Sequence, residues 1–315
     1  YNDLNEKYSY YYKFILNNIT NNLDCKTIKL YKPNCWYIIN EKIDNILINF
    51  KKEYIFILTP VEFVLNIISN NKLLNLLIKY NINYIFISQE VLNTKNNIIG
   101  YEELIFKYQN INILDFYKYS IYNIITNNYS KKVLKDNNII YKYFQIDGYN
   151  EKYSYNNLSK DYNNMKYDIL IFGSESKTYN YRNNLINYLK QIYGEKIKVC
   201  NNVYDAELFN IINNCKLTIH IPSYSNLKHI PYPKIFKSFL NDCFLIFEDC
   251  QELYLNNEEN IFETYYFNSK NDNNIINKID LYLNNINLLI NKKNNIKDYI
   301  MINYNINNFI KLLIS

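Results

Sequence analysis

Residues 216–248 read KLTIHIPSYSNLKHIPYPKIFKSFLNDCFLIFE and carry the clearest fold signal in the chain. An apolar run ends at His220, a long polar loop follows, and a helical pattern starts near Pro233 before a second apolar run, which ends at Glu248. Proline is favoured in the first turn of a helix. The stretch therefore predicts strands at 216–220 and 243–247 and a helix at 233–240, the repeating unit of a parallel α/β sheet.

The same alternation continues on both sides of this stretch. Further strands are predicted at 27–31, 35–39, 54–58, 84–87, 111–114, 139–144, 167–172, 196–200 and 261–267. Helices are predicted near 40–50, 61–80, 101–108, 115–136, 180–193, 206–213, 273–291 and 296–314. Apolar strands that alternate with helices indicate mostly parallel sheets covered on both faces, which is the α/β class.

Residues 147–166 interrupt this rhythm, because they hold Gly148 and many Asn, Ser and Lys residues with little periodicity. We interpret them as a linker. A chain of 315 residues corresponds to about two domains. The predicted organisation is an N-terminal domain at 1–146, a linker at 147–166, a C-terminal domain at 167–291 and a final helical segment at 292–315.

Composition excludes several classes of protein. The 36 Tyr residues and the abundant Asn, Ile and Lys have A/T-rich codons, which points to the genome of a giant virus, a protozoan parasite or an A/T-rich bacterium. The net charge of +5 is dispersed, which argues against nucleic-acid binding. Six Cys without a Cys-x-x-Cys pair and only two His argue against a zinc site.

The cysteines also bear on the compartment. Cys200, Cys215 and Cys243 lie in or beside apolar runs and are predicted to be buried thiols, which fits a reducing compartment such as the cytoplasm. No apolar run is long enough to span a bilayer. The chain opens at Tyr1 without Met, so we expect that an N-terminal segment has been trimmed.

Two junctions are candidates for ligand binding. Gly173 ends an apolar strand before a helix, where an open α/β sheet places its ligands, although a plain turn explains it equally well. Lys234 lies in the first turn of the helix at Pro233, where the helix dipole disfavours a cation. A bound phosphate, held also by N–H groups of that turn, would account for this lysine, and a solvated surface lysine is the alternative.

The order of these pieces resembles the C-terminal domain of GT-B glycosyltransferases, especially the branch similar to spore-maturation CgeB-like proteins. The resemblance rests on Gly173-Ser174, a helix with the only arginine Arg182, Tyr204-Asp-Ala-Glu-Leu, Ile219-His220 and Pro233-Lys-Ile-Phe before the strand that ends at Glu248. It covers residues 168–250 and extends more faintly through 87–90, 115–120 and 144–149.

The resemblance implies two Rossmann-like domains that face each other across a cleft. It also implies a UDP- or GDP-type nucleotide sugar as donor, an acceptor held by the N-terminal domain, and no bound metal or cofactor. The diphosphate would meet the helix that starts at Pro233. The donor-binding residues it suggests are Gly173, Ser174, Arg182, Tyr204, Ser223, His229, Tyr232, Lys234 and Ile235.

The chain departs from the family pattern at charged positions. Lys234 stands where the family has Arg, and His229 and Lys237 stand where related enzymes have Glu. A catalytic base for sugar transfer is expected to be a carboxylate or His near the acceptor. Glu62 and Glu90 follow predicted strands and are the candidates, although each is also explained as a surface charge. His220 is more typical of a packed histidine.

Three functions remain open from the sequence. The first is a glycosyltransferase that acts on a glycan or protein, for example in surface-glycan assembly. It would lie in the cytoplasm, or in the host cytoplasm or the virion if the protein is viral. The second is a catalytically degenerate GT-B module that binds a nucleotide, a glycan or a protein, which the missing acidic residues favour. The third is a nucleotide-sugar epimerase of the same architecture. The oligomeric state is not predicted.

Overall fold

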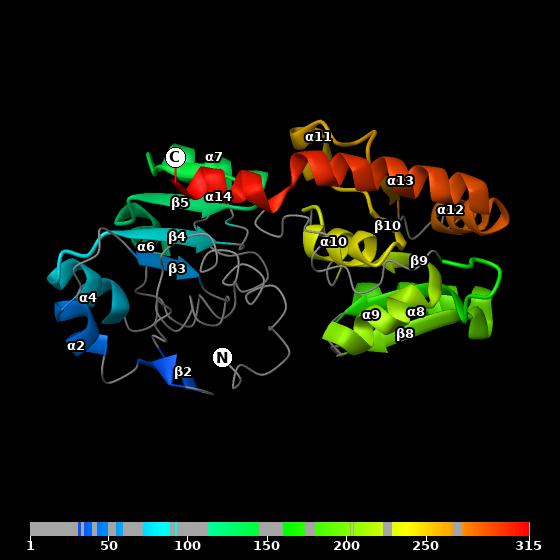
Figure 1. The fold of residues 1–315 in the computed structure, drawn as a ribbon, viewed down its shortest axis with the longest axis horizontal. Helices are drawn as coiled ribbons and strands as arrows, with labels where there is room; N and C mark the ends of the chain where they lie inside the picture. The colour runs from blue at the N-terminus through cyan, green and yellow to red at the C-terminus, as the bar shows by residue number, and fades with distance from the viewer. Residues whose placement is uncertain are drawn as a thin grey trace. The chain divides into compact units, whose positions relative to one another are not determined.

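The computed structural model divides into two compact units (Figure 1). Unit 1 comprises Tyr1–Ile146 and Leu312–Ser315, and unit 2 comprises Asp147–Lys311. The structure describes residues 31–32, 35–39, 43–49, 55–58, 72–88, 92, 113–144, 160–173, 180–201, 203, 205–222, 229–266 and 273–314.

Unit 1 is built around a parallel sheet. Its strands, in spatial order, are β3 (Ile55–Leu58), β4 (Tyr84–Ser88), β5 (Tyr122–Ile125) and β6 (Tyr141–Tyr143). An antiparallel pair, β1 (Tyr31–Lys32) and β2 (Cys35–Ile39), precedes them. The described helices are α2 (Ile43–Ile48), α4 (Lys72–Lys79), α6 (Ile113–Lys118) and α7 (Asn128–Asp136). Every residue of β4 is buried, as expected for a strand covered on both faces.

Two predictions in unit 1 are wrong. The predicted strand at 111–114 overlaps helix α6, and the predicted helix at 115–136 is interrupted by strand β5. Strand β5 was missed because of Asn123, a buried polar residue within it. Its Nδ2 donates hydrogen bonds to the carbonyl oxygens of Tyr117 and Ile140, which gives the N–H donors of the amide their partners inside the sheet. The predictions at 27–30, 61–71 and 101–108 lie outside the described residues.

Unit 2 contains a five-stranded parallel sheet. Its strands are β7 (Tyr167–Gly173), β8 (Ile197–Asn201), β9 (Cys215–His220), β10 (Phe244–Glu248) and β11 (Glu263–Tyr265). Its helices are α8 (Asn180–Tyr193), η3 (Gly194–Lys196), α9 (Asp205–Asn213), α10 (Tyr232–Leu240), α11 (Gln251–Asn256), α12 (Asn273–Asn284) and α13 (Ile286–Asn303), and the last helix of the chain is α14 (Ile306–Ile314). The strands predicted for this half are confirmed, as are the helices up to 240, α8 residue for residue. The helices predicted at 273–291 and 296–314 are wrong in extent, because Asn285 caps α13 and separates it from α12, and helix α11 was not predicted.

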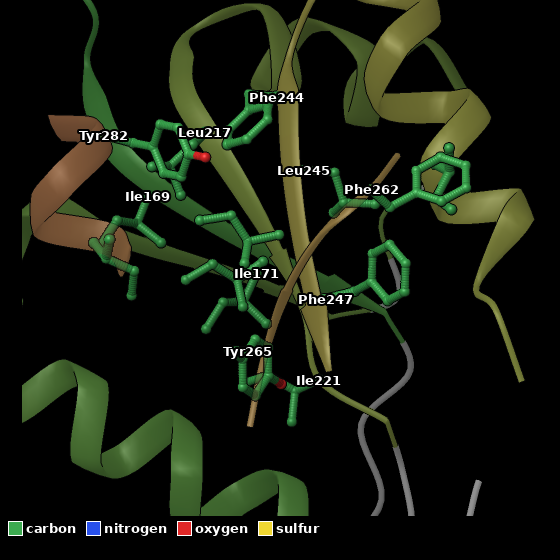
Figure 2. Packing of buried hydrophobic residues seen from close by; sticks show 14 of the residues in the cluster. Ile169, Ile171, Leu217, Ile221, Phe244, Leu245, Phe247, Phe262, Tyr265 and Tyr282 are labelled. Carbon is green, nitrogen blue, oxygen red and sulfur yellow. The ribbon is translucent and has the colours of Figure 1, made fainter. Parts of the chain in front are cut away.

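The core of unit 2 lies on both faces of this sheet. Figure 2 shows Ile169 and Ile171 of β7 beside Leu217 of β9, with Tyr282 reaching in from α12. The rings of Phe244 and Tyr282 lie 4.6 Å apart between centroids. Burying each such side chain contributes about 1.5–3 kcal/mol. Cys200, Cys215 and Cys243 are buried free thiols, as predicted.

The segment predicted as a linker also contributes to unit 2. Tyr162 is buried in the core, and the Nζ atom of Lys160 donates hydrogen bonds to the carbonyl oxygens of Ile212 and Cys215. Within the described ranges, none of the helices combines the length and the hydrophobicity that a membrane span requires.

The strand order of unit 2 defines a switch point. The order is β11-β10-β9-β7-β8, so the chain moves outward from β7 to β8 and then returns past β7 to β9. In open α/β sheets, ligands bind at the carboxyl ends of the strands on either side of such a reversal. Here those two ends are Gly173 of β7 and His220 of β9.

Candidate functional site

Gly173 and Arg182 pack against each other at the carboxyl end of β7. Arg182 is the third residue of α8 and is buried, with 4% of its surface exposed. A Cβ atom at Gly173 would lie 2.6 Å from Nη2 and 2.7 Å from Nη1 of Arg182. Gly173 also has φ +156°, a backbone conformation that other residues rarely adopt. The guanidinium therefore occupies space that only glycine leaves open.

Lys234 approaches the same strand end from α10. Its Nζ atom donates a hydrogen bond of 3.1 Å to the carbonyl oxygen of Phe172 and lies 4.2 Å from the centroid of the Phe172 ring. Among the described residues, no carboxylate forms an ion pair with Lys234. Burial, followed by the positive charges of Lys237 and Arg182, holds the pKa of Lys234 well below its ordinary range. The amine thus lies in a positive field.

Both cations occupy the first turn of a helix. Arg182 is the third residue of α8, and Lys234 is the third residue of α10. A positive charge in the first turn costs about 0.3–1 kcal/mol against the helix dipole. Two such cations therefore lie together at the switch point. They repel each other, and each is also disfavoured by the dipole of its own helix. An anion bound between them would relieve both unfavourable effects.

The backbone of α10 does not supply the free N–H groups that the sequence predicted. The N–H of Tyr232 donates to the carbonyl oxygen of Ile230, and the N–H groups of Lys234 and Ile235 both donate to that of Pro231. Pro233, as predicted, lies in the first turn, and it has no N–H. The expectation is wrong because this tight turn uses its own donors. Charge at this site therefore comes from side chains.

His220 completes the group that we call the switch-point cluster, which consists of Gly173, Arg182, His220 and Lys234. The Nδ1 atom of His220 is buried and has no hydrogen-bond partner among the described residues. Its backbone carbonyl oxygen accepts a hydrogen bond of 3.1 Å from the hydroxyl of Tyr265. Burial, then the charges of Lys234, Arg182 and His229, hold the pKa of His220 well below its ordinary range, so the ring is neutral.

The neutral state of His220 predicts a pH effect on stability. In the unfolded chain, histidine takes up a proton as the pH falls through about 6.5, whereas the folded protein resists it, so the folded state loses stability below that pH. Between about pH 6.5 and 5.5, we expect the free energy of unfolding of the variant H220Q to fall by about 1 kcal/mol less than that of the unchanged protein. This corresponds to a difference of roughly 2–4 °C in melting temperature. Melting curves at the two pH values measure this, and equal losses would contradict it.

A carboxylate lies beside the switch-point cluster. Glu248 ends β10, and its Oε2 atom accepts a hydrogen bond of 2.5 Å from the hydroxyl of Tyr181 in the first turn of α8. Burial raises the pKa of the Glu248 carboxyl, and the hydrogen bond from Tyr181 opposes that effect. This pair was not predicted as part of the site. The sequence signal that could have indicated it is the end of an apolar strand at Glu248.

The other predicted donor-binding residues differ in their placement. Tyr232 and Ile235 have only 2% and 0% of their surfaces exposed, and the Tyr232 hydroxyl donates a hydrogen bond to Glu258. His229 is half-buried before α10, and burial lowers its pKa. Ser174, Tyr204 and Ser223 lie outside the described residues, as do the predicted catalytic Glu62 and Glu90. In the described part of the chain, no group of three His, Cys, Asp or Glu is placed to hold a metal ion.

Comparison with solved structures identifies the architecture. HepE of Anabaena, crystallised with UDP and glucose, matches with a TM-score of 0.61 and 8% identity, over 86% of this chain and 79% of that chain. Trehalose-6-phosphate synthase matches with a TM-score of 0.54 and 13% identity, over 99% of this chain and 85% of that chain. An α-glucosyltransferase in complex with UDP-glucose and DNA matches with a TM-score of 0.51 and 10% identity, over 84% of this chain and 80% of that chain.

Sequence comparisons give no closer assignment. No family model matches the chain, and no curated protein matches it. The resemblance to the CgeB-like branch thus stays a prediction. The structural likeness, at identities of 8–13%, concerns the fold. The chain has the GT-B fold, with the parallel α/β architecture predicted from its sequence.

Proposed function

We propose that the chain is a glycosyltransferase that transfers a hexose from a UDP- or GDP-sugar to a glycan or protein acceptor. The observation that carries the proposal is the pairing of Arg182 and Lys234 in the first turns of two helices at the switch point of unit 2. A diphosphate is the anion that fits two cations held at such a place in an α/β sheet.

The chemistry follows from this placement. When the bond between the sugar and the diphosphate breaks, negative charge develops on the departing phosphate oxygen. In the proposed reaction, Arg182 and Lys234 stabilise that charge, which is the role that fixed cations play in many active sites. Their positions are set by Gly173 and by the carbonyl oxygen of Phe172 before the substrate arrives. The proposed reaction uses these side chains and no bound metal.

Glu248 and Tyr181 have a second role in this proposal. A carboxylate beside a phosphate-binding group can accept hydrogen bonds from the hydroxyls of a ribose or a sugar. Glu248 lies on β10 one residue beyond Phe247, which pairs with His220 on β9. The carboxylate thus belongs to the same edge of the sheet as the switch-point cluster. It could supply the acidic contact that Lys237 does not provide.

Solved structures with this fold support a nucleotide-sugar substrate. The HepE structures contain UDP with glucose and UDP-glucose, and the α-glucosyltransferase structure contains UDP-glucose. The second candidate function is a GT-B module that binds such a ligand without transferring the sugar. His229 and Lys237 favour it, because they stand where the resembled family has carboxylates.

Nucleotide binding can be tested by thermal stability. A ligand at about 100 times its dissociation constant stabilises a folded protein by about 2.7 kcal/mol. We expect UDP or GDP to raise the melting temperature more than the corresponding nucleoside, because the switch-point cluster contacts phosphate. CMP and dTDP complete the panel. A protein that no nucleotide stabilises would contradict the proposal.

Turnover separates the two candidate functions. The sugar conjugate of the stabilising nucleotide is incubated with the protein, and release of nucleoside diphosphate is followed over hours. Slow hydrolysis that the variant K234M lacks supports transfer chemistry. Nucleotide binding without turnover, with glycan and protein acceptors present, would favour the binding module.

A further inference from the structure

The turn that leads into α10 lacks the usual stabilisation of a helix start. Its N-cap residue is Pro231, which forms no side-chain cap. Ile230, directly before it, is nevertheless fixed from outside the turn. Its backbone N–H donates a hydrogen bond of 2.9 Å to the Oε2 atom of Glu252 in α11, a carboxylate with 1% of its surface exposed.

A second buried carboxylate holds the other side of the same turn. Glu258, also 1% exposed, accepts a hydrogen bond of 2.7 Å from the hydroxyl of Tyr232 on Oε2, the atom that also accepts from the Asn256 amide at 3.1 Å. Its Oε1 atom accepts hydrogen bonds from the hydroxyls of Tyr299, at 2.9 Å, and Tyr304. One carboxylate therefore joins the first residue of α10 to the end of α13.

Stability alone does not explain these carboxylates. Burial of a carboxylate costs several kcal/mol, which hydrogen bonds offset only in part, and apolar residues of similar size often give a more stable protein. Such groups fix one geometry, because each lone pair needs a donor in a set direction. Here both carboxylates come from residues 252–258 and contact residues 230 and 232, two to four positions before Lys234. The geometry that they fix is the start of α10.

We propose that Glu258 is a positioning residue for the diphosphate site and acts through Tyr232. The hydrogen bond to Tyr232 sets the position of the first turn of α10, and this turn places Lys234 beside the carbonyl oxygen of Phe172. Glu252 supports the same turn through Ile230. The inference rests on the proposed function, because it assigns the purpose of this geometry to diphosphate binding.

Two tyrosines provide a matched test. Both Tyr232 and Tyr299 donate a hydroxyl hydrogen bond to Glu258, but only Tyr232 belongs to α10, and its hydroxyl also bonds to the Tyr304 hydroxyl and the Asn256 amide. The variants Y232F and Y299F each remove one hydroxyl and leave the carboxylate with other donors. We expect Y232F to weaken UDP binding about tenfold, the equivalent of one hydrogen bond, and Y299F to leave it unchanged. Uridine binding should be equal in both, because uridine has no phosphate.

The measurement is isothermal titration of both variants with UDP and uridine, or with GDP and guanosine if GDP is the nucleotide that stabilises the protein. A purely structural role of Glu258 would lower the melting temperatures of both variants without separating their UDP affinities. Equal UDP affinities, or equal losses for UDP and uridine, would overturn the positioning role while the proposed function stands. Failure of the unchanged protein to bind any nucleoside diphosphate would contradict the proposed function itself.

Discussion

The variant K234M is expected to lose roughly ten- to hundredfold in affinity for UDP, since a hydrogen bond to a charged group contributes about 1.5–3 kcal/mol. Methionine keeps an apolar side chain of similar length and removes the ammonium group, whose Nζ atom lies 4.2 Å from the centroid of the Phe172 ring. The described first-turn N–H groups of α10 donate to its own backbone, so they do not replace the lost amine. Calorimetric titration with UDP, UMP and uridine measures the loss, which should be largest for UDP and absent for uridine.

Lys237 offers a matched control on the same helix. It is half-buried, lies one turn further along α10, and contributes to the positive field that lowers the pKa of Lys234. The variant K237M should therefore change UDP affinity much less than K234M, although both remove one positive charge. Similar losses in the two variants would indicate a diffuse electrostatic effect. That outcome would remove Lys234 as a direct phosphate contact.

The fold of unit 2 was predictable because its local patterns agree with its tertiary structure. Strands β7, β9 and β10 are short apolar runs bounded by polar residues, and α8 places Leu185, Ile186 and Leu189 on one buried face. In unit 1 the same reasoning failed at β5. A buried Asn123 interrupts the apolar run there, and only the positions of Tyr117 and Ile140 show where its N–H donors find partners.

The site was predictable only where it coincides with the ends of strands and helices. Gly173 and Lys234 could be found because a strand ends at one and a helix begins near the other. The contact between Tyr181 and Glu248 joins residues 67 positions apart, and that between Tyr232 and Glu258 joins residues 26 positions apart. No periodicity records such pairs, so they depend on the strand order and on how the helices pack.

The variant G173A is expected to lower both stability and UDP affinity. The added methyl group would lie 2.6 Å from a guanidinium nitrogen of Arg182, so the buried arginine must move. Overpacking of this kind costs about 1–3 kcal/mol, which corresponds to roughly 2–4 °C in melting temperature per kcal/mol. Displacing Arg182 also removes one of the two proposed phosphate contacts, so UDP affinity should fall about tenfold.

A variant of Arg182 tests whether the clash causes the loss of UDP affinity in G173A. In an R182M background the guanidinium is gone, so adding G173A should cost only the backbone strain at φ +156° and should not weaken UDP binding further. Gly194 serves as the control, because no described atom beyond its chain neighbours lies within 4 Å of a Cβ placed there, and its φ of +55° suits asparagine. The variant G194N should leave UDP affinity unchanged. Additive losses in the double variant would mean that Gly173 and Arg182 act independently, and the cluster would no longer be a single anion-binding unit.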